Sequence, residues 1–589
     1  MTRIVIDPVT RVGGQLRVEA EVAGGAVTDA WVAGTMLRGI ETVAVGRDPR
    51  DAWLLTQRVC GTCTGVHGLA SVRAVEQALG IQIPTNARLV RNIMAGTMLV
   101  RDHVMVLYQR ALPDWVDINA ATTADDLATS RLAQASSGWP RSGSGYFRTM
   151  RDRLAALVAS GQPGPFGGWS GHPGYRLSPE QSLLLMSHML EAFDWQRDFL
   201  RAEALLGGKD PHAQTYLVGG VALAPPWGGP EASMTRQHPP VPGRNTPAAL
   251  SEEGLDLLGG LIAGARTFVD QVYVPDVRML AEAYPEYAGI GAGPGNYLAF
   301  GDYPLDGGKD PAMLLPRGRL MDGNLEAAQP VSEASVAESV QHAWYTYDNG
   351  DDALRKPFEG QTDPAFTATI PLTQLDGDGK YTWCKAARYE GLVMETGPLA
   401  RVLVAAANGQ AEIRLALGKA FDLTGLRTNS MASVIGRMVA RTVESQVFAL
   451  QLGTWVEELR SNLATGDVAL VNIASWDPVS WPSEAQGWSL GEGPRGAVGH
   501  WMSFSNERVD HYQIVDGSTW NASPRDALGM RGPLEVALTG VRVADPAQPL
   551  EILRVIHSIA PCAACAVHAF DPRPGGRRVL PASVMEATR

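Results

Sequence analysis

The stretch Arg58-Val-Cys60-Gly-Thr-Cys63-Thr-Gly-Val-His67 places two thiols at Cys-x-x-Cys spacing and an imidazole shortly after them. A second copy, Pro561-Cys562-Ala-Ala-Cys565-Ala-Val-His568, stands near the other end of the chain, so almost the whole sequence lies between the two motifs. Four of the five cysteines belong to these motifs. If the motifs share one site, the two ends of the chain must meet, and we expect residues 1–568 to fold as one intertwined unit.

Two Cys-x-x-Cys turns can surround one soft metal, because each turn points both sulfurs the same way and the second turn completes a tetrahedron. On spacing alone, a structural zinc site, a thiolate-bound redox metal and a dithiol redox pair all stay open. The long separation of the motifs weakens the zinc interpretation, since zinc ribbons usually close over a short stretch of chain. Five cysteines in 589 residues do not form a disulfide framework, so we expect reduced thiols.

The composition is that of an ordinary globular chain, with 45% apolar and 19% charged residues. The formal net charge of -12 disfavours binding to nucleic acid or to an anionic membrane through net charge. No apolar run approaches the roughly 18 residues of a membrane span, and the chain begins without the apolar segment and cleavage site of a signal peptide. We therefore expect a soluble protein without a nucleic-acid partner, which leaves the cytoplasm only if a partner carries it.

The hydrophobic pattern predicts an α+β fold that is mainly α. Residues 3–35 alternate apolar and polar side chains, which predicts a small N-terminal antiparallel sheet with a turn at Gly24-Gly25. Residues 490–561 mix strand patterns with Gly, Pro and Asn turns, which predicts short peripheral strands. Apolar positions recur at helical spacing in five segments, which we expect to form a bundle core of long helices. These segments are residues 69–79, 86–112, 179–206, 248–283 and 411–463.

The residues around the cysteines carry a more specific signal. Arg58-x-Cys60-Gly-x-Cys63-x-x-x-His67 and Pro561-Cys562-x-x-Cys565-x-x-His568 closely resemble the two signature motifs of the nickel-iron hydrogenase large (catalytic) subunit. The resemblance runs nearly end to end, and within the family it is to the uptake type. The other matching segments are residues 7–11, 34–41, 46–53, 171–173, 207–212, 394–401, 494–501 and 520–525.

By this resemblance, the four cysteines would hold a nickel-iron centre and the chain would be a hydrogenase, an oxidoreductase. Cys60 and Cys562 would be terminal nickel ligands, while Cys63 and Cys565 would bridge nickel to an iron that carries carbon monoxide and cyanide. Splitting dihydrogen needs a soft electrophilic metal pair and a nearby base, and the terminal thiolate of Cys562 would be that base.

Several further residues match groups that surround the centre in the family. Pro494, Arg495 and Ser518 would contact the diatomic ligands, with Arg495 donating to a cyanide and leaning over the nickel. Without the matching segment around it, an ion pair would be the simpler interpretation of Arg495. His67 would hydrogen-bond a cysteine sulfur. Asp102 matches a carboxylate above the nickel, although an aspartate beside a histidine on a helix is more often part of a polar core network.

The resemblance also implies a second site for a hard metal. Glu41, His568 and the main-chain carbonyl of Ile514 would hold magnesium, or iron in its place, together with several waters. This site would tie the end of the chain to its beginning. The simpler interpretations are a solvated helix-terminal carboxylate for Glu41 and a hydrogen-bonded core histidine for His568.

Two acids that the family usually keeps beside the nickel are missing. The family reads Arg-x-Glu-Gly-His where this chain reads Arg11-Val-Gly13-Gly14-Gln15, and it normally has aspartate at the position of Ala560. Gly13 and Gln15 cannot take up a proton as glutamate and histidine can. We expect an altered proton exit, through ordered water and Asp102 or His67. A slow enzyme biased toward hydrogen sensing and a degenerate site are the alternatives.

The resemblance finally implies partners and a place in the cell. Beyond the four ligands only Cys384 remains, which cannot hold an iron-sulfur cluster alone, so electrons would pass to an iron-sulfur small subunit in a heterodimer or a dimer of heterodimers. Residues 569–589 resemble the extension that a maturation endopeptidase removes once nickel is in place. A membrane cytochrome and the periplasmic side of the cytoplasmic membrane, reached through the partner, would follow from kinship, with a cytoplasmic location as the alternative. A non-catalytic electron-transfer scaffold and a structural zinc protein are the remaining function classes.

Overall fold

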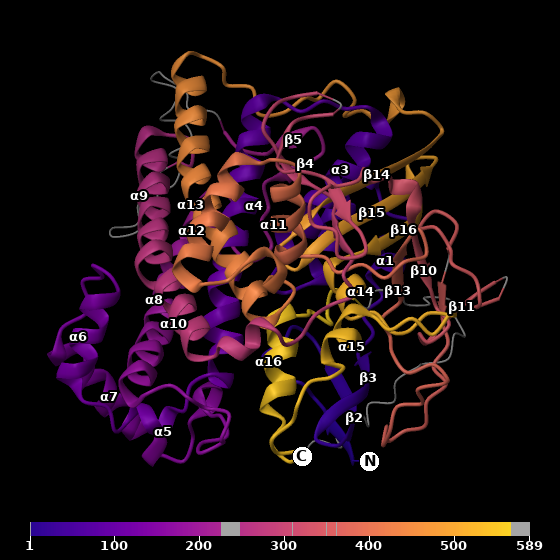
Figure 1. The fold of residues 1–589 in the computed structure, drawn as a ribbon. Coiled ribbons are helices and arrows are strands. Elements are labelled where there is room, and N and C mark those ends of the chain that lie inside the picture. The colour runs from indigo at the N-terminus through magenta and orange to yellow at the C-terminus, as the bar shows by residue number, and fades with distance from the viewer. Residues whose placement is uncertain (1, 225–247, 309, 349, 361, 567–589) are drawn as a thin grey trace.

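The computed structural model describes residues 2–224, 248–308, 310–348, 350–360 and 362–566. His568, assigned above to a hard metal, and residues 569–589, assigned to a processing extension, lie outside the described residues. Long helices form the body of the molecule, and small antiparallel sheets lie on their flanks (Figure 1). The predicted α+β, mainly α fold is confirmed.

The core is a bundle of long helices. α4 (Thr85–Met105) packs between α8 (Pro179–Gly207) and α13 (Val434–Ala464), and α9 (Glu252–Phe268) packs on both of these neighbours. Most of α4 is buried on all sides, as expected for a helix at the centre of a bundle rather than on its surface. The bundle carries Asp102 near the end of α4, and so supports one wall of the site described below.

Three of the predicted helices are interrupted. The segment predicted at 86–112 continues past α4 as a π-helical turn (Val106–Ala111) and a 3-10 turn (Leu112–Asp114). The segment at 248–283 is α9 and α10 (Val274–Ala283), joined by a π-helical turn. The segment at 411–463 is α12 (Ala411–Thr424) and α13, because Gly425 adopts φ 73° and ends the first helix.

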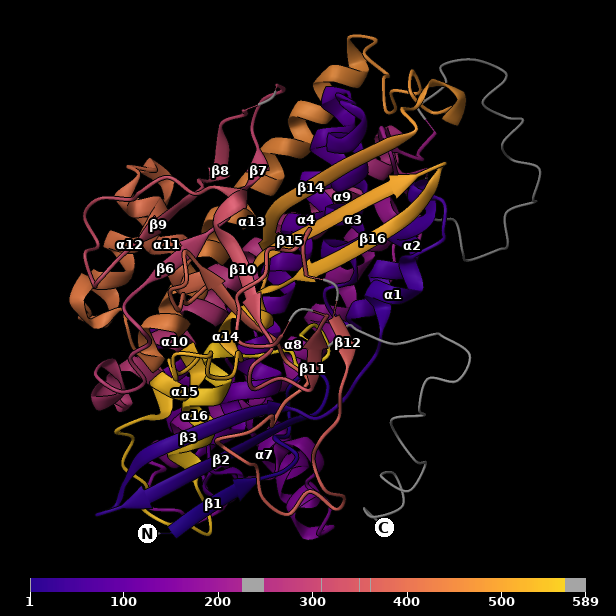
Figure 2. The ribbon, with the colours of Figure 1, turned by 90° about the vertical axis from the view of Figure 1, so that its right-hand side faces the viewer.

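The N-terminal sheet brings the two ends of the chain together. Strands β1 (Thr2–Ile6), β2 (Leu16–Ala23) and β3 (Ala26–Gly34) pair antiparallel in this order, and Gly24-Gly25 turns the chain as predicted. α15 (Pro533–Leu538) packs on both β3 and α16 (Leu550–Ile559), so the last helix lies close to the first sheet (Figure 2). This contact delivers the second cysteine motif to the N-terminal part of the protein.

A second three-stranded sheet covers α3 (Thr64–Leu79), the helix that follows the first cysteine motif (Figure 2). Its strands β14 (Glu484–Gly493), β15 (Gly496–Ser505) and β16 (Arg508–Val515) are longer than the sequence pattern predicts, because glycines break the alternation. Gly487 shows why a glycine is needed, since a side-chain carbon there would lie 2.1 Å from the carbonyl oxygen of Ala74 in α3.

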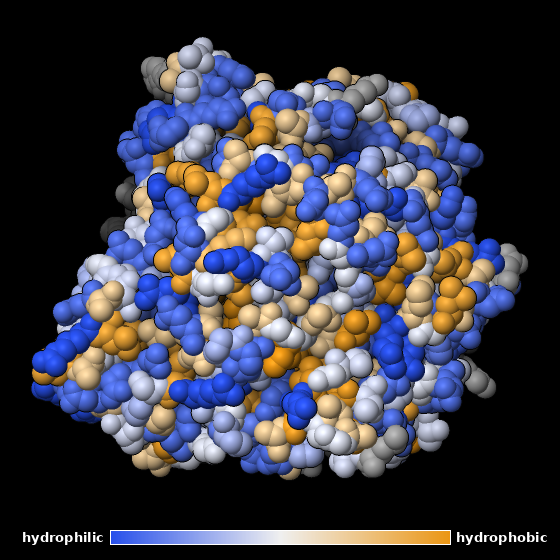
Figure 3. Space-filling view, in the orientation of Figure 1, coloured by the Kyte–Doolittle hydropathy of each residue, from blue (hydrophilic) through white to orange (hydrophobic). Residues whose placement is uncertain are grey.

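The face drawn in Figure 3 is largely hydrophilic, with apolar side chains scattered among charged ones. Across the described ranges, no helix combines the length and the apolar character that crossing a bilayer requires.

Shorter elements complete the fold. The remaining helices are α1 (Ile40–Ala44), α2 (Ala52–Thr56), α5 (Ile118–Ala121), α6 (Asp126–Ser136), α7 (Ser144–Ala159), α11 (Pro398–Ala407) and α14 (Gly517–Asn521). The remaining strands are β4 (Tyr216–Leu217), β5 (Gly220–Val221), β6 (Tyr297–Ala299), β7 (Asp302–Pro304), β8 (Met313–Leu315), β9 (Gly318–Leu320), β10 (Val336–Ser339), β11 (Tyr345–Tyr347), β12 (Thr362–Pro364) and β13 (Ala386–Tyr389).

Candidate metal centre

The two cysteine motifs meet at one buried site. Cys60 follows a 3-10 turn (Gln57–Val59), and Cys63 stands at the N-terminus of α3. Cys562 and Cys565 follow α16, whose helical path ends at Ala560 in the left-handed conformation, with φ 57°. The expected meeting of the chain ends is therefore observed, with sulfur atoms from the two motifs in contact.

The four sulfurs form a compact cluster. Their Sγ atoms are 3.7 Å apart for Cys60 and Cys562, 3.3 Å for Cys63 and Cys565, and 3.1 Å for Cys562 and Cys565. A tetrahedron of thiolates with metal-sulfur bonds of about 2.3 Å has edges of about 3.8 Å. All four thiols are free and buried. Donor number, softness and spacing therefore fit a thiolate-bound metal centre.

Burial and mutual hydrogen bonds separate the acidities of these thiols. A hydrogen bond with Cys562 holds the pKa of Cys60 well below its usual value, and Cys60 Sγ also accepts the N–H groups of Thr62 and Cys63 at 3.3 and 3.2 Å. The hydrogen bond with Cys562 raises the pKa of Cys63, and burial raises that of Cys565. Deprotonating the whole cluster therefore needs a nearby positive charge, which a bound metal provides.

Arg495 and Asp102 are paired with each other beside the cluster. Nε and Nη2 of Arg495 donate to the two carboxylate oxygens of Asp102 at 2.8 and 2.6 Å, and Nη1 donates to the carbonyl of Ala560 at 2.7 Å. Burial acts to raise the pKa of Asp102, but the charge and hydrogen bonds of Arg495 hold this pKa well below its usual range. The ion pair considered for Arg495 is thus present, and Arg495 also binds the carbonyl group of Ala560, two residues before Cys562.

Residue 13 contacts the cluster from the N-terminal side. Gly13 forms an isolated parallel bridge with Cys562, and its carbonyl accepts the N–H of Ala564 at 3.2 Å. A side-chain carbon on Gly13 would lie 2.5 Å from Cys562 Sγ. Residue 13, where the resemblance implies a glutamate, therefore packs directly against a cysteine of the cluster.

Gly14 is expected to be sensitive to substitution, because it adopts φ 77° and a side-chain carbon would lie 2.4 Å from the backbone nitrogen of Ala564. Gly14→Ala should lower the free energy of unfolding by about 1–3 kcal/mol and reduce the nickel content by displacing the second motif. Gly24→Ala is the matched control, since Gly24 has φ 60° with no atom within 4 Å of an added carbon. Thermal unfolding and metal analysis compare the two, and equal nickel contents would contradict the expectation.

Ser518 contacts the second cysteine motif, and Pro494 stands beside Arg495 in the chain. Ser518 is the second residue of α14, and its Oγ accepts the N–H of Cys562 at 2.9 Å. Pro494 stands in the tight turn between β14 and β15, directly before Arg495. The turn at the end of this hairpin therefore presents Arg495 to Asp102, while α14 holds the backbone of the second motif.

The predicted hard-metal site is represented by Glu41, in the first turn of α1. Glu41 Oε1 accepts the N–H of Ile514 at 2.8 Å, so the contact observed uses the amide of Ile514, whereas the resemblance implies its carbonyl as a ligand. Lys385 Nζ lies 3.7 Å from Glu41 and 3.3 Å from Glu338, and all three side chains are buried. Burial raises the pKa of Glu41, and the charge of Lys385 opposes the shift. Sequence reasoning missed Lys385 and Glu338, which belong to no recognisable motif.

His67 heads a buried chain of polar groups. Its Nδ1 lies 3.1 Å from Nε2 of His500, whose Nδ1 lies 2.9 Å from the hydroxyl of Tyr512. Burial lowers the pKa of His67 to about 4, so its imidazole is neutral at pH 7. Nε2 of His67 has no hydrogen-bond partner among the described residues. If the Tyr512 hydroxyl donates into the chain, this nitrogen carries the terminal N–H.

Asp516 is a site residue that sequence reasoning missed. Ligand atoms of His67, Asp516 and Cys565 all lie within 4.8 Å of one another, and those of Cys60, Cys63 and Cys565 form a second such group. Burial raises the pKa of Asp516 to about 6, although hydrogen bonds from Thr519, Cys565 and Ser518 oppose the shift. One feature of the sequence could have pointed to Asp516. It stands directly after the apolar end of β16 and three residues before Thr519, which is a helix N-cap pattern.

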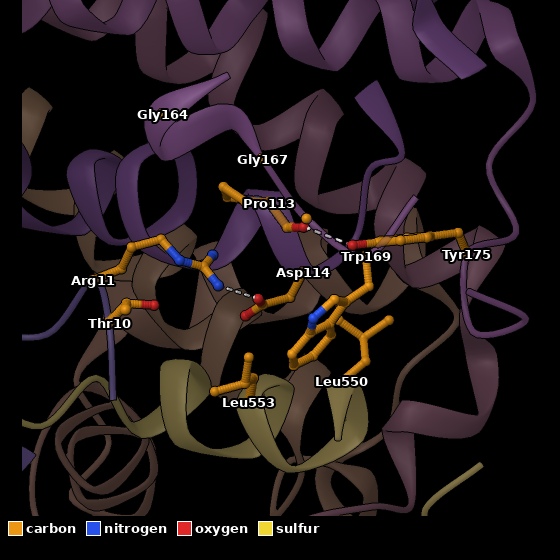
Figure 4. A pocket seen from close by; sticks show the side chains of 11 residues that line it. Thr10, Arg11, Pro113, Asp114, Gly164, Gly167, Trp169, Tyr175, Leu550 and Leu553 are labelled. Atoms are coloured by element: carbon orange, nitrogen blue, oxygen red, sulfur yellow. Dashed lines mark hydrogen bonds and ion pairs between the residues drawn. The ribbon is translucent and has the colours of Figure 1, made fainter. Parts of the chain in front are cut away.

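A pocket of about 430 Å³ opens beside the segment that leads to Gly13 (Figure 4). In its wall Arg11 and Asp114 face each other and form an ion pair at 2.5 Å. His557 in α16 pairs with the same Asp114 carboxylate at 2.5 Å and with the carbonyl of Thr10 at 3.0 Å. This network ties the segment before Gly13 to α16, the helix before Cys562, and so holds the two parts of the chain together.

Comparisons with known proteins agree with this geometry. A family model described as nickel-dependent hydrogenase matches residues 38–568. The uptake hydrogenase large subunit of Bradyrhizobium diazoefficiens is 41% identical over 585 residues, which cover 97% of this chain and 96% of that protein. The hydrogenase-1 large chain of Escherichia coli K12 is 39% identical over 584 residues, which cover 96% and 95% of the two chains.

Solved structures give the same result. The Ni-Fe-Se hydrogenase from Desulfovibrio vulgaris Hildenborough, in the reduced state, aligns with a TM-score of 0.74 and 30% identity and covers 96% of this chain and 100% of that chain. The Ni-Fe-Se hydrogenase of Desulfomicrobium baculatum aligns with a TM-score of 0.74 and 27% identity and covers 96% and 100% of the two chains. With the family motifs gathered at one buried thiol cluster, the chain belongs to the nickel-dependent hydrogenases, as a large subunit similar to those of uptake hydrogenases.

Proposed function

We propose that this chain is the catalytic subunit that oxidises dihydrogen at a nickel-iron centre held by Cys60, Cys63, Cys562 and Cys565. The observation that carries the proposal is the convergence of four buried free thiols from the two ends of the chain. When bound, a thiolate-held nickel-iron pair supplies a soft electrophilic site that splits dihydrogen heterolytically. The roles of Cys60 and Cys562 as terminal ligands, and of Cys63 and Cys565 as bridges, are part of this proposal.

The residues around the cluster hold the ligands and receive the proton. Cys562 is the base in this proposal, and Ser518 holds its backbone N–H while Gly13 packs against its sulfur. Arg495 keeps a positive charge beside the thiolates, because Asp102 and the Ala560 carbonyl fix three of its donors. Both groups of the Arg495–Asp102 pair are buried, so bulk water does not screen this charge.

We also propose that the iron carries carbon monoxide and cyanide as ligands. Pro494, Arg495 and Ser518 would surround them. Ser518 can serve, because its Oγ accepts the Cys562 N–H and its hydroxyl hydrogen stays available to donate. Magnesium at Glu41 is proposed in the same way. A buried carboxylate needs a cation, and Lys385, the only cationic neighbour of Glu41 among the ion pairs of the described residues, is shared with Glu338.

The proton would leave by a different way from that of relatives with an acid at residue 13. Position 13 has no titratable group, and position 560 offers only a backbone carbonyl, which Arg495 occupies. Asp102 is held by Arg495, whereas His67 begins a hydrogen-bonded chain through His500 to Tyr512. We propose that ordered water joins the cluster to His67 or Asp102, because such water can replace a carboxylate as a link.

Electrons would pass to an iron-sulfur small subunit. Beyond the cluster the chain has only Cys384, which is buried and donates to the carbonyl of Lys385, so it cannot hold a redox cluster of its own. A heterodimer, or a dimer of heterodimers, is therefore proposed. Attachment to the periplasmic side of the cytoplasmic membrane through this partner, a membrane cytochrome as acceptor, and removal of residues 569–589 by an endopeptidase are proposed from kinship.

Metal analysis and infrared spectroscopy of the purified complex test the proposal. We expect nickel and iron in near-equal amounts, stretching bands of metal-bound carbon monoxide and cyanide, and dihydrogen-dependent reduction of a dye. Zinc alone, or metallated protein without these bands, would contradict the assignment. Magnesium in the same sample would support the Glu41 site, and the intact mass of the chain shows whether residues 569–589 have been removed.

The missing acids favour a second candidate, a slow hydrogen-sensing relative or a degenerate site. Gly13 and Ala560 remove two proton-accepting groups beside Cys562 without removing any cysteine. Infrared bands that shift when dihydrogen is added, combined with no dye reduction, would favour the sensor. Loaded protein whose bands ignore dihydrogen would indicate a degenerate site.

A further inference from the structure

The carboxyl group of Asp516 has two roles in the structure, and the first is to cap α14. Its Oδ1 accepts the N–H of Ser518 at 2.9 Å, the N–H of Thr519 at 2.8 Å and the hydroxyl of Thr519 at 3.1 Å. All three bonds use one carboxyl oxygen, and the residue is only 2% exposed. The cap therefore fixes the side chain in place without using Oδ2.

The second role concerns Cys565. A carboxyl oxygen of Asp516, a ring nitrogen of His67 and Sγ of Cys565 lie within 4.8 Å of one another, and all three residues are buried. Nε2 of His67 is buried and has no hydrogen-bond partner in the described chain. Asp516 and His67 thus share one neighbour, the sulfur of Cys565.

Cys565 belongs to two overlapping groups of ligand atoms. One group contains Cys60 and Cys63, and the other contains His67 and Asp516. The Cys565 sulfur therefore has both soft thiol donors and polar nitrogen and oxygen groups as close neighbours. A fixed charge or dipole acts strongly on a sulfur atom in such a site, because buried surroundings screen it far less than water does.

We propose that Asp516 is a positioning residue of the metal centre, whose carboxyl group polarises the Cys565 sulfur and so sets the electron density that this thiolate gives to its metals. The inference rests on the proposed function, since it takes Cys565 to be a bridging ligand. It assigns to Asp516 an electronic role in addition to the helix cap, and it concerns a residue outside both cysteine motifs.

Asp516→Asn separates the two roles of this residue. Asparagine caps helices about as well as aspartate, so α14 should keep its start, whereas the negative charge near Cys565 is lost. We expect an unchanged thermal midpoint, altered g values in the nickel electron paramagnetic resonance spectrum, and carbon monoxide and cyanide bands at higher wavenumber, because a less electron-rich thiolate gives less density to the iron. Asp516→Val should shift the same signals and also lower the thermal midpoint.

Thr519→Val is the matched control. It removes the hydroxyl that bonds Asp516 and weakens the same cap, while the carboxyl group stays beside Cys565. We expect a lower thermal midpoint with wild-type spectra. Asp516→Asn spectra that coincide with those of the wild type, or equal spectral shifts in Thr519→Val, would overturn the inference.

The two readouts keep this inference apart from the proposed function. Absence of diatomic bands in the loaded wild type would defeat the proposed iron ligands, but the nickel spectrum would still report the polarity around Cys565. Nickel g values that move in Asp516→Asn and not in Thr519→Val would then support the role of Asp516 on their own.

Discussion

Replacing Cys562 with alanine is expected to reduce hydrogen-dependent dye reduction by more than about 100-fold, since even the outer partners of metal ligands are worth 10–100-fold. The nickel content of the purified chain should fall with it. Cys562 Sγ lies 3.7 Å from Cys60 and 3.1 Å from Cys565, so it joins the two motifs into one ligand set. Elemental analysis and a dye assay under dihydrogen measure both effects.

Cys384→Ser is the matched control for this experiment. Cys384 is also buried, at 1% exposure, and its Sγ donates to the carbonyl of Lys385 at 3.4 Å, but it is not part of the sulfur cluster. Serine can keep this hydrogen bond, so nickel content and activity should stay close to those of the wild type. A Cys562→Ala chain that kept its nickel and its activity would refute the assignment of the centre.

Replacing Arg495 with methionine is expected to lower the free energy of unfolding by about 3–5 kcal/mol, because it leaves the carboxylate of Asp102 buried and unpaired. Both partners are only 6% exposed, so water cannot take over the lost contact. The pKa of Asp102 is held below its usual range, so the pair contributes stability at neutral pH that is lost as the pH falls through the acid range. The Arg495→Met loss should therefore shrink in acid, which denaturant unfolding at several pH values measures.

Arg495→Lys separates charge from geometry at this position. Lysine keeps the positive charge but lacks the planar fork that bonds both oxygens of Asp102 and the Ala560 carbonyl. We expect dye reduction to fall by about 10–100-fold, as for other outer partners of metal ligands. Arg437→Lys is the control, because Arg437 makes a similar two-bond pair with Glu395, at 2.7 and 2.9 Å, away from the sulfur cluster. Equal losses of activity in the two variants would show that Arg495 acts only on the fold.

Local patterns in the sequence were sufficient for the helices and the first sheet. Helical spacing predicted α4, α8 and α13, because a buried helix face repeats its apolar residues over many turns. The sheet over α3 was harder to predict. Its strands contain several glycines, and at Gly487 a glycine is needed because the backbone of α3 approaches closely. Such a close approach depends on a helix more than 400 residues earlier in the chain and leaves no local pattern.

Some residues of the site could likewise be predicted from the sequence, and others could not. The motifs around Cys60 and Cys562 predicted the thiol ligands, because donor type and spacing are properties of a few neighbouring residues. Asp516 and Lys385 escaped prediction, since a single polar residue shows its function only when its buried neighbours are known. The contact between the amide of Ile514 and Glu41 was also not predicted, because it joins residues that are far apart in the chain, while the carbonyl of Ile514 as a metal ligand stays a prediction.

By itself, the sequence determined the four soft thiol donors of this protein and the absence of a titratable side chain at Gly13 and Ala560. Only the tertiary structure decided that Asp102 pairs with Arg495, that Gly13 packs on the Cys562 sulfur, and that Asp516 stands beside Cys565. The physical reason is that donor chemistry is carried by each side chain. Charge, pKa and polarity in a buried site depend instead on which distant groups exclude water together.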